Sequence, residues 1–285
     1  MRKRLFFCVL AVLLCSIRSM AQQPQMQPLT FWYEYTVNPG KEAQFLEIVK
    51  TVGAPVRDKL MAEGVVKAWG VMTPLLRSPG GTTHSIWYAV EDYAGIEKVQ
   101  GAMTAQIAKL TEEASKAGVT KKGATPTAAP MARLAEVADI GKTHDYLTRD
   151  IVIGLNPSIS ADGLLPYSRF NFVKVKPGKA AEYRKAWEKY NKPILDKLMA
   201  DGVVLAYGLA VEDIRTDGNF THFTWYDTKD LASMDKIRAA FIGDRDHRSQ
   251  EEQDAITHLF VNLTDMDASR AEVDHAVIFH VGPMK

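Results

Sequence analysis

The chain has 285 residues, with 35 Lys or Arg, 34 Asp or Glu and two cysteines. Both cysteines, Cys8 and Cys15, lie in the N-terminal stretch 1–21. The remaining chain therefore offers no disulfide, no thiolate nucleophile and no cysteine-ligated metal or iron–sulfur cluster.

Residues 1–21 have the organisation of a secretory signal peptide, in which a basic segment precedes an apolar run and small residues. The basic residues lie at 2–4, the apolar run covers 5–15, and 19–21 reads Ser-Met-Ala. The run is shorter than the ~20 residues that span a bilayer. We expect export to the periplasm or beyond with cleavage after Ala21, and a retained membrane anchor is the alternative.

Loss of the leader leaves 31 basic and 34 acidic residues, a net charge of −3. A chain with no basic surplus lacks the usual electrostatic attraction to nucleic acid or to an anionic membrane. We therefore expect neither as a partner of the mature protein.

An internal repeat organises the rest of the chain. Residues 36–103 match 174–241 at a constant shift of 138 without gaps, and about two positions in five are identical. A period this long indicates two similar domains, because solenoid repeats have periods of ~20–50 residues. We place the first unit at 22–155, the linker at 156–166 and the second unit at 167–285.

The first unit predicts strands at 31–37, 65–73, 83–90 and 146–155. A helix lies between the first two strands, and its apolar stripe has helical spacing: Phe45, Ile48, Val49, Val52, Val56 and Leu60. Pro55 should kink or split this helix, and Gly64 should end it in a left-handed conformation. Asp92 is placed to cap a second helix. The stretch 118–130, rich in Gly, Ala, Thr and Pro, is expected to be a loop.

The second unit repeats this order, with strands predicted at 169–175, 203–211, 221–227 and 274–281. Pro193, Gly202 and Asp230 match the proline, glycine and capping aspartate of the first unit. An additional helix is expected around 249–263. Each unit thus reads β-α-β-β-α-β, the ferredoxin-like arrangement of an α+β fold.

The segment 172–179, which reads FVKVKPGK, precedes a long helix and a strand that begins Gly-Val-Val. This pattern resembles the dimeric α/β-barrel proteins, which include the antibiotic-biosynthesis-monooxygenase-like and NIPSNAP-like families. The resemblance covers most of the mature chain and implies two ferredoxin-like units packed sheet to sheet as a barrel, here within one chain. It implies little about activity, because fold does not determine function. Monomer and homodimer both remain open.

Several catalytic signatures are absent from the sequence: the phosphate-binding G-x-x-x-x-G-K-[ST], the dinucleotide-binding G-x-G-x-x-G after a strand, G-x-S-x-G and H-E-x-x-H. The sequence thus lacks the usual motifs of nucleotide hydrolysis, Rossmann-type redox chemistry, hydrolase chemistry and zinc proteolysis. No motif specifies a metal or another cofactor.

The best catalytic candidates are histidines and tyrosines that occupy matching positions in the two units. Strand alternation places His84 and Tyr88 on one face, and His222 and Tyr226 on the same face of the other unit. We expect this face to look into the space between the sheets, where it could bind a metal, hold a haem or transfer protons. Retention of a shared ancestral residue is the alternative.

The first strands suggest a pocket. Phe31, Tyr33 and Tyr35 of the first unit match Arg169, Asn171 and Val173 of the second. An aromatic wall opposite a cation and an amide is typical of a small-molecule site. The alternative is that these residues pack against helices or end a strand in solvent.

Three functions follow from these residues. We expect an exported protein that binds a small, largely apolar molecule between its two sheets. The alternative is an enzyme resembling the monooxygenases of the superfamily, cofactor-free or haem-dependent, with the His and Tyr candidates transferring protons. A protein-interaction module is the third.

Overall fold

The computed structural model describes residues 27–77, 81–120, 129–156, 163–216 and 220–282. The expected signal peptide and residues 157–162 of the expected linker lie outside this part of the chain. Within the described ranges, no helix is both long and apolar enough to cross a membrane.

Unit one, which runs from β1 to β4, alternates strands and helices in the predicted order. Its strands are β1 (Leu29–Tyr35), β2 (Val66–Pro74), β3 (His84–Val90) and β4 (His144–Leu155). Its helices are α2 (Glu42–Ile48), the π-helix η1 (Val49–Gly53), α3 (Ala54–Ala62), α4 (Tyr93–Thr120), α5 (Pro130–Val137) and the 3-10 helix η2 (Ile140–Lys142). The expected loop at 118–130 is therefore partly helical at both ends.

Unit two, which runs from β5 to β8, repeats this order, but a different helix, α9, precedes its last strand. Its strands are β5 (Tyr167–Val175), β6 (Ala206–Ile214), β7 (His222–Thr228) and β8 (Thr264–Val281). Its helices are α6 (Ala180–Tyr190), α7 (Lys192–Ala200), α8 (Leu231–Asp246) and α9 (Gln250–Leu263). β8 begins ten residues before the predicted strand at 274–281.

Local signals explain where these helices end. Pro55 and Pro193 lie in the first turn of α3 and α7, where a missing N–H costs nothing, so each long helix is divided before its proline. Gly64 and Gly202 follow the helices with φ of 77° and 70°, as a left-handed C-terminal residue requires. The Asp230 side chain accepts a hydrogen bond from Ser233 N and caps α8.

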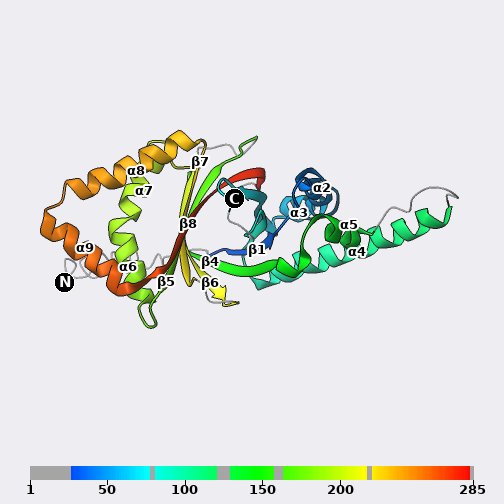
Figure 1. Ribbon diagram of the computed structural model, residues 1–285, viewed down its shortest axis with the longest axis horizontal. Helices are drawn as coiled ribbons and strands as arrows, with labels where there is room; N and C mark the ends of the chain where they lie inside the picture. Colours follow the sequence, from blue (N-terminus) through cyan, green and yellow to red (C-terminus); the bar gives the residue numbers. More distant parts are fainter. Residues whose placement is uncertain (1–26, 78–80, 121–128, 157–162, 217–219, 283–285) are drawn as a thin grey trace, which may run out of the picture.

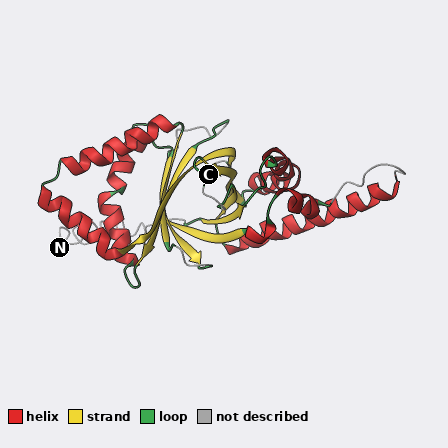
Figure 2. Ribbon diagram, viewed as in Figure 1, coloured by secondary structure: helices red, strands yellow, loops and turns green. Residues whose placement is uncertain are grey.

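The eight strands form one closed antiparallel barrel in the order β1-β3-β2-β8-β5-β7-β6-β4. Each unit supplies a four-stranded sheet, and the two sheets join where β2 pairs with β8 and β4 pairs with β6. The helices of unit two cover one side of the barrel and those of unit one the other, with α4 extending beyond it (Figures 1 and 2). The structure confirms the α+β fold of two ferredoxin-like units closed into an intramolecular barrel.

Both faces of the sheets are buried. Outward-facing residues pack under the helices in two separate clusters, centred on residues such as Phe45 and Trp69 in unit one and Trp187 and Tyr207 in unit two. Inward-facing residues form a third cluster inside the barrel. A sheet covered on both faces gives no polar side by which to orient its strands.

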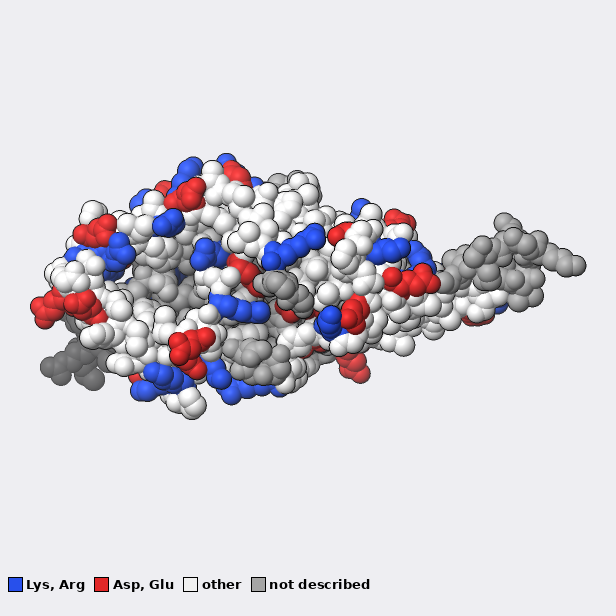
Figure 3. Space-filling model, in the orientation of Figure 1, with Lys and Arg blue, Asp and Glu red and all other residues white. Residues whose placement is uncertain are grey.

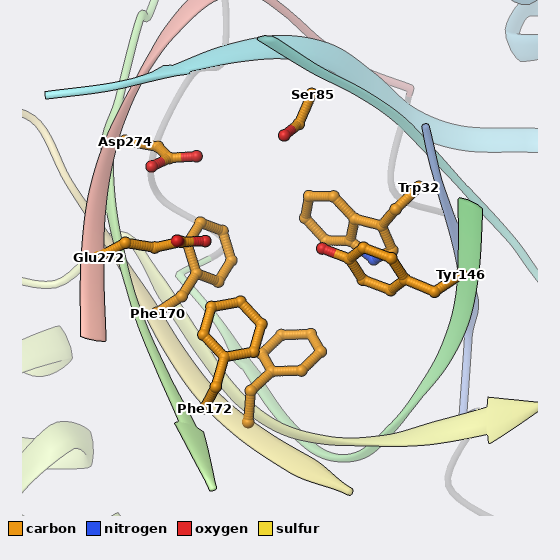
Figure 4. A pocket seen from close by; sticks show the side chains of 8 residues that line it. Trp32, Ser85, Tyr146, Phe170, Phe172, Glu272 and Asp274 are labelled. Carbon is orange, nitrogen blue, oxygen red and sulfur yellow. The ribbon is translucent and has the colours of Figure 1, made fainter. Parts of the chain in front are cut away.

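Aromatic side chains fill the barrel. Trp32 stacks on Tyr146 at 5.9 Å between ring centroids and meets Phe170 edge to face at 5.7 Å. Figure 4 shows these rings, with Phe172, around the remaining space, a cavity of about 10 Å³. Such a volume holds at most about one water molecule. The expectation of a ligand between the two sheets is therefore wrong in its location.

Carboxyl groups also point into the barrel. Asp274 and Glu272 face the cavity from β8 (Figure 4), and Oδ1 of Asp274 has no hydrogen-bond partner. Burial, with Glu272 and Glu34 nearby, raises the pKa of Asp274 to about 8. Asp150 accepts a 2.8 Å hydrogen bond from Trp225 Nε1, and burial raises its pKa to about 7. Both units thus contribute carboxyl groups to the barrel interior, and ionisation of these groups should affect the stability of the barrel.

Candidate functional site

A space that suits a small molecule lies on the outer face of unit one, between its sheet and its helices. This pocket has a volume of about 220 Å³. Its walls come from β1, β3, the α2–η1–α3 segment, α4 and α5, and are mostly apolar. Five lining side chains are polar: Tyr33, Tyr35, Arg57, Gln100 and Thr104. An apolar pocket with a few placed polar groups is the usual form of a ligand site.

The helix over the pocket has an unusual backbone. η1 (Val49–Gly53) is one π-helical turn inserted between α2 and α3. Val49, Val52 and Gly53 all line the pocket from this turn. Single π-helical turns inside α-helices occur frequently at functional sites. The wide turn and its small side chains leave room beneath the helix.

Gly53 makes room for Arg57 one turn later. A Cβ atom at Gly53 would lie only 2.3 Å from Nη1 of Arg57. Because φ of Gly53 is −89°, its backbone is not left-handed, and a side chain at 53 would force the Arg57 side chain to shift. The absence of a side chain at 53 therefore lets the guanidinium lie against the helix.

Arg57 is buried, and no anionic side chain among the described residues forms an ion pair with it. It is 4% exposed, and its Nε has no hydrogen-bond partner. The guanidinium lies 5.5 Å from the centroid of the Trp69 ring, a cation–π contact. Burial lowers the pKa of Arg57, yet a guanidinium keeps its proton in proteins. The pocket wall therefore carries a positive charge.

Tyrosines of the sheet and one amide from α4 form a hydrogen-bonded polar group at the pocket. Gln100 Nε2 donates hydrogen bonds to the phenol oxygens of Tyr33 at 2.5 Å and Tyr88 at 3.1 Å. Burial raises the pKa of Tyr35 to about 12, and it also raises the pKa of Tyr33 and Tyr88. All three phenols are thus neutral at pH 7, so none of them balances the charge of Arg57.

The structure reverses the expected orientation of the histidines. His84 and His222 lie on the outer faces, under the helices of their own units, with ring contacts to Phe45 at 4.9 Å and to Tyr183 at 5.4 Å. Desolvation lowers the pKa of each to about 4. The two histidines are separated by the barrel and cannot share a metal or a haem. Their pairing reflects the repeat, and Trp87 lies on the inward face instead.

The remaining candidates divide between the units. Tyr33 and Tyr35 line the pocket, while Phe31 stacks on Tyr88 at 5.6 Å beside it. Arg169 and Asn171 lie on the outer face of unit two, where Arg169 Nε donates to Asn171 Oδ1 at 3.1 Å. The two groups expected to face each other across one pocket are therefore on opposite sides of the barrel.

Tyr226 lies on this outer face of unit two, opposite Arg169 in the β5–β7 ladder. Its pKa is raised by burial, an effect that the charge of Arg169 opposes. A catalytic role for Tyr226, as for Tyr88, stays a prediction.

Sequence reasoning missed Arg57, Gln100 and Gly53. A signal for Arg57 was present, because it lies three residues before Leu60 on the apolar stripe and the repeat places Leu195 at its position. When one copy of a buried stripe has a charged residue and the other copy has leucine at the matched position, the two copies differ in role there.

Metal and haem have little support in this geometry. No group of three or more His, Cys, Asp or Glu side chains among the described residues could hold a metal ion. No histidine lines the pocket, and its volume is below the ~300 Å³ at which pockets for drug-sized ligands begin. A haem does not fit this pocket as the helices stand.

Neither a family model nor a curated protein matches this sequence. Among solved structures, the chain is similar to a candidate monooxygenase from Fusobacterium nucleatum subsp. nucleatum, with 14% identity over 90% of this chain and 96% of that one and a TM-score of 0.58. It is also similar to a candidate monooxygenase from Lactobacillus acidophilus, with 10% identity over 90% and 98% of the two chains and a TM-score of 0.55. At these identities the similarity shows the fold, that of the dimeric α/β barrels.

Proposed function

We propose that unit one binds a small, largely apolar molecule in the pocket between its sheet and its helices. The main support for this proposal is that the two units have different helix residues at matched positions. Val49, Val52 and Gly53 leave the pocket open, where unit two has Trp187, Tyr190 and Asn191. The leader expected at 1–21 would place this binding outside the cytoplasm.

A ligand-induced rise in melting temperature tests the proposal, because a molecule that binds only the native state stabilises it. Protein purified from its natural compartment should carry a small molecule in native mass spectrometry. The double variant Val52→Tyr with Gly53→Asn copies the residues of unit two and should lose both the bound molecule and the thermal shift. Retention of both by this folded variant would refute the pocket.

Oxidation of the bound molecule by O₂ is a second candidate function. Similarity in fold to the two candidate monooxygenases, and the tyrosine–glutamine–arginine wall around the pocket, favour it. A cofactor-free reaction that converts a CH₂ group and O₂ into a carbonyl group and water balances without a further reductant.

An oxygen electrode and mass spectrometry of the retained molecule test this second function. Uptake of one O₂ per molecule converted, lost in Tyr33→Phe without loss of binding, would support an enzyme. Binding without any O₂ uptake would leave a binding protein.

The face shown in Figure 3 bears Lys, Arg, Asp and Glu side chains interspersed over both helical layers. No single sign of charge dominates this view. This agrees with the expectation from net charge that nucleic acid is not a partner, which stays a prediction.

A further inference from the structure

The charge of Arg57 narrows the chemistry of the ligand. Among the described residues, no carboxylate forms an ion pair or hydrogen bond with this guanidinium, which is 4% exposed. Burying an unpaired charge costs several kcal/mol, so proteins rarely keep one without a compensating group. The compensating group is missing from the part of the chain that the structure describes.

The acidic side chain whose charge acts on Arg57 already has other partners. Asp58 raises the pKa of Arg57 by its charge, but its Oδ1 accepts a 2.8 Å hydrogen bond from Trp69 Nε1 and lies 3.9 Å from His280 Nδ1. The Asp58 side chain is 47% exposed, so it is not buried together with the guanidinium. Asp58 therefore does not neutralise Arg57 inside the pocket.

The rest of the pocket excludes other charge types. A cationic ligand would be repelled by Arg57. A phosphate dianion would need several donors, whereas Arg57 is the one cationic side chain among the lining residues that the structure describes. Apolar groups such as Ile48, Ile86 and Ile107 form most of the wall. A guanidinium matches a planar carboxylate with two parallel hydrogen bonds.

We infer that the pocket of unit one takes a monocarboxylate with a compact apolar body, whose carboxylate pairs with Arg57. This inference rests on the proposed binding function. The apolar body would lie against η1 and α4, and the carboxylate would supply the missing counter-charge. Unit two, with Leu195 at the matched position, would not bind it.

Matched probes test the inference. Three bodies, octyl, cyclohexylethyl and naphthyl, are each prepared with a carboxylate, a carboxamide or an ammonium head, and binding is measured by calorimetry at pH 7. For the body that fits, we expect the carboxylate to bind at least ~10-fold more tightly than the carboxamide, since a hydrogen bond between two charged groups is roughly twice as strong as one between neutral groups. The ammonium compound should not bind.

Variants separate the two proposals. Arg57→Leu should abolish the preference for carboxylate while leaving carboxamide affinity within about threefold, and Arg57→Lys should keep the preference. Arg184→Leu, which removes a cation paired with Glu188 on the surface of unit two, is the charge control and should change nothing. Circular dichroism and the melting temperature verify that the variants fold. We expect Arg57→Leu to fold, because unit two has leucine at the matched position 195.

Each contrary result overturns a defined claim. Equal binding of carboxylate and carboxamide, lost in both cases in the Val52→Tyr, Gly53→Asn variant, would keep the pocket and refute the anionic ligand. Failure of every body to bind, or binding that survives the filled pocket, would refute the proposed function itself.

Discussion

The two halves of the barrel use the same fold for different purposes. In unit two, Trp187 is 1% exposed and Leu195 is 3% exposed, so the helices rest on a filled core. In unit one, the matched positions carry Val49 and Arg57, and a pocket of about 220 Å³ opens there. The strands of the two units pair in the same order, and β2 matches β6 and β3 matches β7 in length. A binding site can thus arise from a few helix and strand residues while the order of strand pairing is kept.

This difference has a thermodynamic side. Large side chains in unit two gain burial energy, whereas unit one forgoes that gain and buries a charge. Sites that bind ligands commonly cost stability in this way.

The largest expected effect concerns the filled core. Trp187→Ala should destabilise the protein by about 3–5 kcal/mol, because it removes a fully buried ring and leaves a cavity. Val49→Ala, its match in unit one, should cost only about 1.5 kcal/mol, since it borders an existing pocket. Urea unfolding measures both. Equal losses would show that the two helical layers are packed alike.

Removal of the buried charge of Arg57 should stabilise the protein, in contrast to removal of the Trp187 ring. Arg57→Leu should stabilise the ligand-free protein by about 1–4 kcal/mol, because it replaces an unpaired buried cation with an apolar side chain. The reverse change in unit two, Leu195→Arg, should destabilise it. A lower melting temperature for Arg57→Leu would mean that the arginine is compensated within the chain.

The barrel interior, common to both halves, should control the pH dependence of stability. The pKa of Asp274 is about 8 in the folded protein against an ordinary value of 3.8. Its protonated form is therefore favoured by folding, and the stability it contributes below pH 4 is lost as pH rises toward 8. Asp274→Asn stays neutral, so its free energy of unfolding should fall less over this range.

Between pH 4 and pH 8 the difference in free energy of unfolding should grow by about a few kcal/mol in favour of the Asp274→Asn variant, because only the wild-type carboxyl ionises when the chain unfolds. Chemical unfolding at pH 4, 6 and 8 measures the difference, in which the shift of Asp150 cancels because Asp274 is not among its causes. A gap that does not widen with pH would contradict the burial of this carboxyl.

The smallest effect should be equal in both halves. Gly64→Ala and Gly202→Ala should each cost about 1 kcal/mol, because both glycines have positive φ and no neighbour within 4 Å of an added Cβ. Thermal unfolding of the two variants gives the comparison. Unequal losses would show that the repeat is less regular than its backbone indicates.

Local chemistry made much of this fold predictable. The proline that divides each helix, the glycine that ends it and the aspartate that caps the next helix act over a few residues, and the repeat displays each signal twice. Helix α5 and the first part of β8 escaped prediction, because they lie where the two copies diverge and the repeat gives no second example.

The orientation of the strands could not be predicted in the same way. Trp87 and Tyr88 are neighbours on β3, both are large and aromatic, and they point to opposite faces that are both buried. Alternation separates the faces but does not rank them when helices cover one and the barrel encloses the other. The placement of Tyr33 beside Arg57 likewise depends on how α3 packs on the sheet, a long-range contact without a local signature.

Closure of the barrel within one polypeptide has a consequence for stoichiometry. A barrel of two identical chains is symmetric, so any helix substitution appears on both sides and yields two sites or none. Here the matched positions mutate independently, and Arg57 has no second copy. The protein is thus expected to bind one ligand per chain, and a titration endpoint at one equivalent would record this broken symmetry directly.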